Sequence, residues 1–305
     1  MQRTALDIPG AARPEASALL QLLKPITWFP PMWAFLCGAV SSGRPLLEQP
    51  LLLLCGVILV GPMVCGASQV VNDWYDRDVD AINEPQRPIP SGRVPGYWGY
   101  YFALVWSALA LLWGALLGTW VMAATALGLA LAWAYSAPPL RLKRNGWWGN
   151  AAVGVCYEGL AWVSGAAVLL GGALPPGKVL LLAALYSIGA HGIMTLNDFK
   201  AIDGDLKMGI RSLPAQLGPA RAARVACLVM IAPQLIVVAL LAAWGQGWHA
   251  ALVAGLVLAQ LGAMLRLLRD PRALAPWYNG TGVTLYVLGM MVAALAVRVP
   301  PGAAG

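Results

Sequence analysis

Charged side chains are scarce in this sequence. Asp, Glu, Lys and Arg make up 11% of its 305 residues, whereas soluble globular domains carry about 25%. Hydrophobic residues make up 59%, and the mean hydropathy is +0.68. This composition excludes an ordinary soluble domain. Several apolar runs of about 20 residues predict instead an all-α, multi-pass membrane protein.

Patterned cysteines and catalytic triads are also missing. The sequence has no C-x-x-C spacing and no ladder of His partners, and all five cysteines lie in apolar runs: Cys37, Cys55, Cys65, Cys156 and Cys227. We interpret them as small core residues rather than metal ligands or disulfide partners. Because no Ser-His-Asp pattern occurs either, no protein nucleophile is indicated.

No secretory signal precedes the first apolar run. Residues 1–23 contain Arg3, Asp7 and Glu15 among prolines and are interpreted as a short polar tail. The remainder, 24–298, is predicted to form one domain. It divides into two pseudo-repeat halves, about 26–137 and 149–266, followed by a last helix at 277–297.

Nine membrane spans are predicted. They lie at about 26–43, 51–72, 98–118, 120–137, 149–170, 178–197, 224–244, 248–266 and 277–297. The first is the weakest, because Pro25, Pro30 and Pro31 would break or kink a helix near its start. The expected fold is therefore a bundle of nine transmembrane helices.

The net charge of +7 follows membrane topology rather than a nucleic-acid surface. Of the 20 Lys and Arg residues, all but Arg44, Lys178 and Arg298 fall in alternate segments between the spans. Cytoplasmic loops of membrane proteins carry such an excess. The pattern predicts a cytoplasmic N-terminus and an odd number of spans, and it argues against nucleic-acid binding.

One segment, from Gln69 to Gly92, concentrates acidic residues in this apolar chain. Asp73, Asp76 and Asp80 stand at i, i+3 and i+7, so a continuing helix would place three carboxylates on one face. These like charges repel and require a counter-charge. Oxygen-only ligands favour Mg²⁺, which keeps part of its shell for substrate phosphates. The alternative is a solvated loop between two membrane helices.

A weak repeat favours the metal interpretation. Asn72-Asp73 ends the second span, and Asn197-Asp198 ends the sixth, followed by Asp203 and Asp205. Four spans separate the two copies, so both emerge on the same side of the membrane. Two halves with matched clusters would bring acids across one cavity.

These motifs resemble the paired Asp-rich motifs of the UbiA superfamily of intramembrane prenyltransferases. NEPQRPIPSG (83–92) and YSAPPLRLKR (135–144) also fit that superfamily. Within it, KPITWFPPMWAF, DAINEPQRPIPSG and NDFKAIDGDLKMGIRSLPAQLG are similar to the chlorophyll synthase branch, and GAHGIMTLNDFKA to bacteriochlorophyll synthases. The resemblance covers nearly the whole chain.

The resemblance implies a UbiA-type helix bundle around a central cavity open to the cytoplasmic side. It further implies an Mg²⁺-dependent transfer of a geranylgeranyl or phytyl group from its diphosphate to the propionate of bacteriochlorophyllide, in the last steps of bacteriochlorophyll synthesis. The expected location is the bacterial cytoplasmic membrane, in its intracytoplasmic photosynthetic part, in contact with lipid. Protein partners are not indicated.

Specific roles follow from this chemistry, because Mg²⁺ held by carboxylates and positioned cations stabilise a diphosphate leaving group. The predicted ligands of one metal are Asp73, Asp76 and Asp80 with Asn72, and those of a second are Asp198 and Asp203, with Asp205 as a further candidate. The predicted phosphate contacts are Arg77, Arg87, Lys143, Arg144 and Lys207, with Tyr135 added by the resemblance. For each basic residue, the alternative is membrane topology or a lipid headgroup contact.

Two ionisable side chains fall inside spans, where charge is costly and usually functional. His191 could ligate the central Mg of the pigment or hydrogen-bond a ring carbonyl, and Glu158 could lie protonated in the pigment pocket. Trp33 is a further pigment candidate. The alternative for each is a side chain satisfied by a neighbouring helix.

Other functions stay open at this point. A chlorophyll synthase proper, or a relative that prenylates a quinone precursor or haem, would share the same motifs. A cation-coupled transporter is the non-enzyme alternative. It predicts acids near the bilayer midplane, whereas here they cluster at the predicted cytoplasmic ends of the spans.

Overall fold

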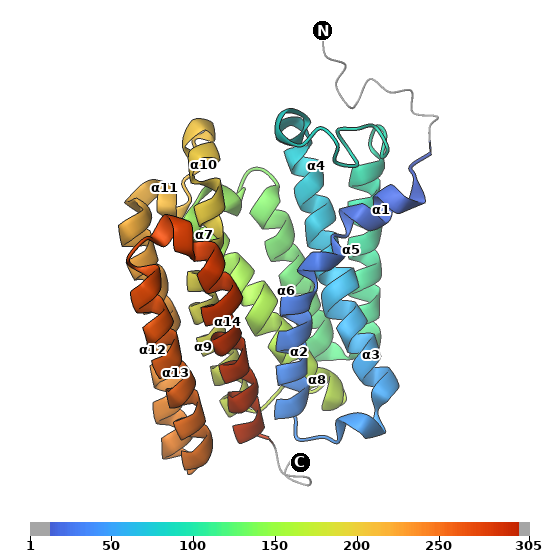
Figure 1. Ribbon diagram of the computed structural model, residues 1–305. Helices are drawn as coiled ribbons and strands as arrows, with labels where there is room; N and C mark the ends of the chain where they lie inside the picture. Colours follow the sequence, from blue (N-terminus) through green and yellow to red (C-terminus); the bar gives the residue numbers. More distant parts are fainter. Residues whose placement is uncertain (1–12, 299–305) are drawn as a thin grey trace.

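The computed structural model of the protein describes residues 13–298, which form a bundle of helices lying side by side (Figure 1). Within this range, eight helical segments are long and apolar enough to cross a membrane. They are α3–η3–α4 (Pro50–Asn83), α5 (Trp98–Leu117), α6 (Thr119–Ser136), α7–η5–α8 (Gly146–Leu169), α9–η6–α10 (Gly177–Met208), α12 (Pro219–Ala243), α13 (Gly247–Leu267) and α14 (Pro271–Ala296).

The prediction of nine such helices is wrong by one, at the first span. Instead of running over 26–43, α2 extends only over Phe29–Ser41, 13 residues. At 1.5 Å per residue it is roughly 20 Å long, short of the ~30 Å hydrocarbon core of a bilayer. Lys24 in a left-handed conformation and a 3₁₀ turn, η1 (Pro25–Thr27), precede it. Pro30 and Pro31 are tolerated only because they stand in its first turn.

Close backbone contact holds this short helix in the bundle. A Cβ atom on Gly38 would lie 1.9 Å from the carbonyl oxygen of Trp162 in α8. A Cβ atom on Gly165 in α8 would lie 1.9 Å from the carbonyl oxygen of Phe35 in α2. Only glycine fits at either position, so α2 and α8 pack backbone to backbone, as small residues permit between membrane helices.

Two of the long segments contain a wider, π-helical stretch. In the first, η3 (Leu59–Cys65) joins α3 (Pro50–Ile58) to α4 (Gly66–Asn83) and contains Pro62. Proline lacks an amide N–H and clashes with the preceding turn, so the helix widens there. The second, η5 (Val155–Leu160), joins α7 (Gly146–Gly154) to α8 (Ala161–Leu169) and contains no proline.

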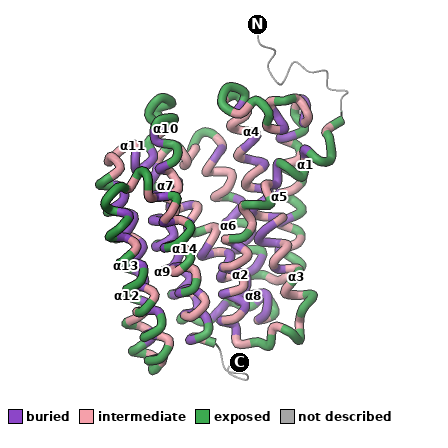
Figure 2. Tube along the Cα trace, in the orientation of Figure 1, coloured by how far each residue is buried: buried purple, intermediate pink, exposed green. Residues whose placement is uncertain are grey.

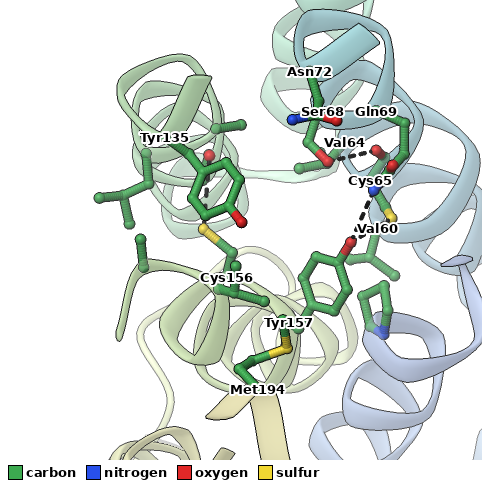
Figure 3. Close-up of a pocket in the computed structure, with 16 residues that line it drawn as sticks. Val60, Val64, Cys65, Ser68, Gln69, Asn72, Tyr135, Cys156, Tyr157 and Met194 are labelled. Atoms are coloured by element: carbon green, nitrogen blue, oxygen red, sulfur yellow. Dashed lines mark hydrogen bonds between the residues drawn. The ribbon is translucent and has the colours of Figure 1, made fainter. Parts of the chain in front are cut away.

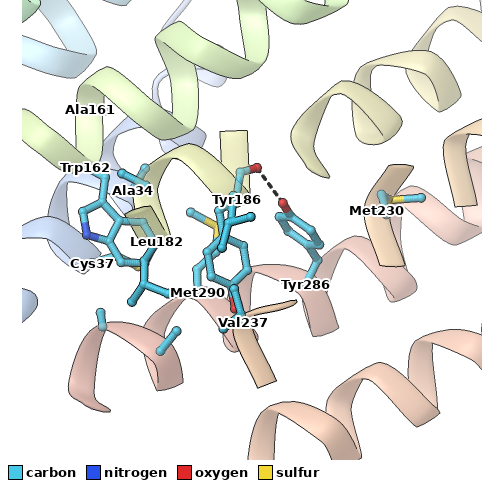
Figure 4. Close-up of a cluster of buried hydrophobic side chains, with 14 of the residues drawn as sticks. Ala34, Cys37, Ala161, Trp162, Leu182, Tyr186, Met230, Val237, Tyr286 and Met290 are labelled. Carbon is cyan, nitrogen blue, oxygen red and sulfur yellow. Dashed lines mark hydrogen bonds between the residues drawn. The ribbon is translucent and has the colours of Figure 1, made fainter. Parts of the chain in front are cut away.

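Aromatic side chains fill the centre of the bundle (Figure 4). Trp162 of α8 stacks on Tyr186 of α9, with ring centroids 5.7 Å apart. The hydroxyl of Tyr286 in α14 donates to the carbonyl oxygen of Tyr186 at 2.6 Å. Nearby, the buried amides of Gln234 and Gln260 hydrogen-bond each other between α12 and α13. Such interhelical hydrogen bonds stabilise bundles that lipid surrounds.

The outer helices expose apolar side chains rather than charges. α12 and α13 lie at the edge of the bundle, with exposed outer faces (Figure 2). Leu228, Leu258 and Leu265 on these helices are each more than two-thirds exposed. In water such a surface would aggregate, whereas in a bilayer it contacts lipid. The surface therefore supports a multi-pass membrane protein.

Residues 16–22 of the N-terminal segment pack against the bundle. Residues 1–12 of the predicted polar tail lie outside the described residues, but Ala16–Leu22 form a helix, α1. Its Ala18 and Leu22 are fully buried with Val70 and Val71 of α4. From Ala16 onward, the segment is therefore part of the packed fold rather than a free tail.

The two acidic segments end at the same end of the bundle (Figure 1). α4 continues to Asn83, so the predicted helix through Asp80 is confirmed. α9 ends at Asn197, as predicted, and the chain then narrows to a 3₁₀ turn, η6 (Asp198–Ala201). Two short helices follow, α10 (Ile202–Met208) and α11 (Leu213–Leu217).

Candidate active site

The first acidic cluster lies on one face of α4, and each of its carboxylates meets a cation. The Lys24 Nζ atom is 2.6 Å from Asp73 Oδ1. Lys143, from the 3₁₀ turn η4 (Leu142–Arg144), forms an ion pair with Asp76. Arg87 Nη1 is 2.8 Å from Asp80 Oδ2.

Arg87 is the centre of this cluster. Besides Asp80, its guanidinium lies 3.4 Å from Asp73 and forms an ion pair with Glu84. Asp73 and Asp80 are only 2% and 7% exposed, and buried carboxylates are costly unless paired. The segment after α4 therefore folds back onto the helix, where Arg87 neutralises the buried carboxylates of Asp73 and Asp80.

These ion pairs alter the predicted metal site. Among residues 13–298, no three His, Cys, Asp or Glu side chains gather closely enough to hold a metal ion. The single-metal triad of Asp73, Asp76 and Asp80 is therefore not formed by the side chains as they lie. The physical reason is that cations separate the three carboxylates, and two of these cations, Lys143 and Arg87, were predicted to contact phosphate instead.

The second acidic cluster differs in its charge balance. Asp198 accepts a hydrogen bond from Asn150 Nδ2 at 3.2 Å, and the buried Asp205 accepts one from Ser212. Neither carboxylate has a Lys or Arg nitrogen within 4.0 Å in the described part of the chain. Asp203 instead is exposed and pairs with Arg272. Of the three predicted acids, the structure thus groups Asp198 and Asp205.

A cavity of about 220 Å³ lies among the helices, with Asn72, Tyr135 and Tyr157 in its wall (Figure 3). Its wall comes from α2, η3, α4, α6, α7, η5 and α9. Asn72 and Tyr135 line it near the acidic ends of their helices. The Tyr135 phenol is within electrostatic reach of Asp76, Asp198 and Asp205. Carboxylates of both clusters therefore act on Tyr135, while the residues that line the cavity include no Asp or Glu; that the clusters face each other across it stays a prediction.

The cavity has polar groups that the sequence did not single out. Gln69 Nε2 donates to the Tyr157 hydroxyl at 3.2 Å, and the Cys65 thiol donates to the same oxygen at 3.4 Å (Figure 3). Lys24 and Asn150 were also missed as site residues. Asn150 could have been found, because an amide inside the apolar run GWWGNAAVG needs a polar partner.

Three of the predicted phosphate contacts lie away from the acids. Arg77 stacks on Trp74, 4.3 Å from the ring centroid, and donates to that residue's carbonyl oxygen. Arg144 and Lys207 are exposed. Of the five predicted basic residues, only Arg87 and Lys143 pair with Asp73, Asp76 or Asp80.

The electrostatics of Lys143 are set by burial. Burial lowers the pKa of its ammonium, and the neighbouring Asp76 carboxylate partly opposes that shift. As a result, Lys143 loses its charge at a lower pH than an exposed lysine. The positive charge of Lys143, which a phosphate-binding role requires, is therefore lost more readily at alkaline pH than that of an exposed lysine.

The three pigment candidates do not line the central cavity. His191 borders a separate apolar groove of about 660 Å³ between α7–α8 and α9, and its Nε2 donates to the Trp147 carbonyl oxygen at 3.2 Å. Trp33 donates to the carbonyl oxygen of Val287 in α14 at 2.9 Å. Glu158 is buried in η5 and forms no ion pair with any described residue.

The donor set fits a hard divalent cation. Asp198 and Asp205 offer carboxylate oxygens and have no Lys or Arg partner within 4.0 Å among residues 13–298, and Asn72 adds an amide oxygen at the cavity. Carboxylate and amide oxygens suit Mg²⁺. With Arg87 and Lys143 opposite, the arrangement can bind a polyanion with its charge divided between metal and protein.

Comparison with known proteins finds a matching family and relatives that align with nearly the whole chain. The UbiA prenyltransferase family matches residues 27–288. The bacteriochlorophyll synthase 33 kDa chain of Cereibacter sphaeroides is 59% identical, with 96% of this chain and 97% of that protein covered. The corresponding protein of Rhodobacter capsulatus is 57% identical over 97% of this chain and 98% of its own length.

A solved structure shares the fold. A UbiA homolog from Archaeoglobus fulgidus, bound to GPP and Mg²⁺, aligns with a TM-score of 0.69 over 92% of this chain and 100% of its own. The sequence identity is 17%, so this likeness bears on the architecture alone. The all-helical fold expected from the resemblance is thereby confirmed.

Proposed function

This chain belongs to the UbiA prenyltransferase family, and from that membership we propose that it joins a prenyl diphosphate to the propionate of bacteriochlorophyllide. The activity is that of a bacteriochlorophyll synthase, as in relatives that are 57–59% identical over nearly their full length. The observation that supports the proposal is a cavity lined by Asn72 and Tyr135, where Asn72 precedes the first acidic cluster on α4 and carboxylates of both clusters act electrostatically on Tyr135.

The reaction exchanges one C–O bond for another. The bond between C1 of the prenyl group and the diphosphate oxygen breaks, and the electron pair leaves with diphosphate. An oxygen of the pigment carboxylate bonds to C1 and forms the ester. Because that carboxylate is already ionised at neutral pH, the reaction requires no protein base and no protein nucleophile.

The residues of the chain bind, orient and screen the reactants. Arg87 and Lys143 would contact the diphosphate; like Lys24, they meet the acids on α4. Tyr135 lies between the clusters and orients the diphosphate through its hydroxyl. The apolar lower wall of the cavity keeps water from the allylic carbon, where it would compete with the pigment.

The proposed cofactor is Mg²⁺. Asp198 and Asp205 would hold one ion, and Asp73, Asp76 and Asp80 with Asn72 stay the predicted ligands of a second, although each of these three acids is paired with a cation in this structure. Asp203 stays a prediction that its exposed position does not favour. When bound, the ion neutralises charge that develops on the leaving diphosphate. Homologous proteins bound to Mg²⁺ with a prenyl diphosphate support this proposal.

The proposal is tested by product formation. Purified protein in detergent is incubated with bacteriochlorophyllide and geranylgeranyl diphosphate, and the pigment is analysed for the ester. Parallel reactions offer chlorophyllide, a quinone precursor and phytyl diphosphate. Esters from bacteriochlorophyllide at the highest kcat/KM support the function, whereas product from the quinone precursor alone would contradict it.

Removing divalent cations should stop this reaction. With EDTA in excess, we expect ester formation to fall by at least about 10³-fold, because an unscreened diphosphate is a poor leaving group. Adding Mg²⁺ beyond the chelator should restore the rate. The direct measurement is binding of inorganic diphosphate with and without Mg²⁺, and equal binding in both conditions would contradict the metal site.

A Lys143→Arg substitution should change the alkaline limb of the pH profile. Burial lowers the pKa of Lys143, so diphosphate binding is complete below that pKa and lost as pH rises through it. Arginine stays charged over this range. The limb of kcat/KM should therefore move to higher pH, with a rate at neutral pH within about tenfold of the parent. An unmoved limb would exclude Lys143 as its cause.

The membrane placement is also proposed from charge. Lys and Arg residues gather at the end of the bundle where the acidic clusters lie, so we place that end and the N-terminus in the cytoplasm. A photosynthetic intracytoplasmic membrane is the proposed location, because the acceptor pigment is used there. His191, Glu158 and Trp33 stay predicted pigment contacts.

A further inference from the structure

The wall of the cavity carries polar groups but no charge. Among residues 13–298, its lining contains no Asp, Glu, Lys, Arg or His side chain. Along η3 and α4, four polar side chains at helical spacing line it one after another: Cys65, Ser68, Gln69 and Asn72. A row of neutral hydrogen-bonding groups therefore starts beside the first acidic cluster and runs into the bundle.

Gln69 and Tyr157 meet in this cavity. The Gln69 Nε2 atom donates to the Tyr157 hydroxyl oxygen at 3.2 Å, and the Cys65 thiol donates to the same oxygen at 3.4 Å (Figure 3). A hydroxyl oxygen that accepts two hydrogen bonds keeps its own hydrogen for donation. That hydrogen has no acceptor among residues 13–298, and neither has the second N–H of the Gln69 amide. The pair therefore offers two unused donors.

The depth of the pair matches the place where the acceptor has to react. Gln69 precedes Asp73 by four residues, so it lies about 6 Å farther from the acidic end of α4, at 1.5 Å per residue. With the diphosphate at the acidic end, C1 of the prenyl group follows directly below it. The attacking oxygen has to stand about 3 Å from C1. One helical turn below the acids is therefore where the carboxylate of the acceptor belongs.

Neutral donors suit a carboxylate that has to remain a nucleophile. An ionised carboxylate that leaves water is costly unless it is hydrogen-bonded, and Gln69 and Tyr157 would provide those bonds. A lysine or arginine at this depth would also bind the carboxylate, but it would hold the negative charge that attack on C1 requires. The ester is neutral, and hydrogen bonds to a charged group are about twice as strong as neutral ones. The same donors therefore hold the product more weakly than the acceptor.

The local structure around Tyr157 gives independent support. Tyr157 stands in η5, a π-helical stretch that contains no proline to account for its widening. Single π-helical turns inside α-helices occur frequently at functional sites. The stretch presents two successive side chains, Cys156 and Tyr157, to the cavity.

We propose that the Gln69 amide and the Tyr157 hydroxyl bind the propionate carboxylate of the acceptor pigment and direct its oxygen at C1 of the prenyl group. The proposal rests on the function proposed above. Only the propionate arm enters, because the cavity of about 220 Å³ is smaller than the roughly 300–1,000 Å³ of sites that enclose a whole ligand. The two residues position the acceptor and transfer no proton.

A Tyr157→Phe substitution should weaken the preference of the protein for the free acid. The probes are bacteriochlorophyllide and its propionate methyl ester, titrated by pigment fluorescence in detergent with Mg²⁺ and inorganic diphosphate. The parent should bind the free acid at least about tenfold more tightly, because hydrogen bonds to a charged group are worth more. In Tyr157→Phe this ratio should fall at least about fivefold, with the methyl ester bound as before. The KM for bacteriochlorophyllide should rise, while that for geranylgeranyl diphosphate stays the same.

Tyr278→Phe is the matched control. The hydroxyl of the buried Tyr278 also has no hydrogen-bond partner within the described residues, but Tyr278 does not line the cavity. This variant should keep the parent's ratio. If Tyr157→Phe does not fold, Gln69→Leu removes the other donor from α4 and must give the same loss.

An unchanged ratio in folded Tyr157→Phe overturns the proposal. Weaker Mg²⁺-dependent binding of inorganic diphosphate, with the ratio intact, overturns it too, because the pair would then belong to the diphosphate. If the ratio falls but the parent forms no ester from bacteriochlorophyllide, the carboxylate site is supported and the proposed function alone is contradicted.

Discussion

Replacing Asp198 with asparagine should lower the rate of ester formation by at least about 10³-fold while the protein stays folded. Asp198 accepts a hydrogen bond from Asn150 and has no Lys or Arg partner among the described residues. Asparagine keeps the size and the hydrogen bond but removes the charge that the proposed metal requires. The measurement is kcat with bacteriochlorophyllide, together with Mg²⁺-dependent binding of inorganic diphosphate.

The neighbouring acids provide the control for this result. Asp205→Asn should resemble Asp198→Asn, because Asp205 likewise accepts a hydrogen bond and has no Lys or Arg partner among the described residues. Asp203→Asn should change the rate by less than about threefold, because an exposed ion pair such as Asp203–Arg272 contributes little. If Asp203→Asn lost most activity while Asp205→Asn stayed normal, the ligands would be Asp198 and Asp203, as predicted from the sequence.

Replacing Arg87 with alanine should destabilise the protein more than any other single change at the end of the bundle where the acidic clusters lie. Its guanidinium neutralises Asp73, Asp80 and Glu84, and the first two are nearly fully buried. Removing one member of a buried charge network typically costs about 3 kcal/mol or more. Arg87 is partly solvated, so we expect about 2 kcal/mol, seen as a lower unfolding temperature in detergent.

Arg77→Ala is the matched comparison for Arg87. Arg77 lies on the same segment and stacks on Trp74, but its nearest carboxylate, on the exposed Asp78, is 3.9 Å away. We expect a loss below about 1 kcal/mol. Adding Asp80→Asn to Arg87→Ala should recover part of the lost stability, because it removes one of the stranded charges. No recovery would mean that Arg87 acts through packing rather than charge.

The sequence predicted the helices and the general site because both depend on local patterns. Apolar runs located the long spans, and i, i+3, i+7 spacing placed three acids on one face of α4. The length of α2 was overestimated because its buried contacts are made by small residues. Gly38 and Gly165 permit a short helix to stay in the bundle through close backbone contact. Hydropathy averaged along the sequence does not register such contacts.

Partnerships between distant residues were not accessible from one sequence. Lys24 was counted only as a topology signal, although it pairs with Asp73 49 positions later. The acids that look equivalent in DFKAIDGD separate in space, because the 3₁₀ turn after Asn197 changes the helical period. Asp203 therefore points outward while Asp205 is buried. The i, i+7 spacing of Asp198 and Asp205 already favoured their grouping, and the assignment of Asp203 to the metal departed from that spacing.

The placement of Lys24 defines where the functional unit begins. Helix α1 buries Ala18 and Leu22 on α4, and the left-handed turn at Lys24 follows directly. One of the two positive charges on Asp73 is thus delivered by the amino-terminal arm. A shortened version for crystallisation or engineering has to retain this arm from about Ala16. Trimming to the first membrane-embedded helix would remove Lys24 and leave Asp73, 49 positions later, with one positive charge fewer.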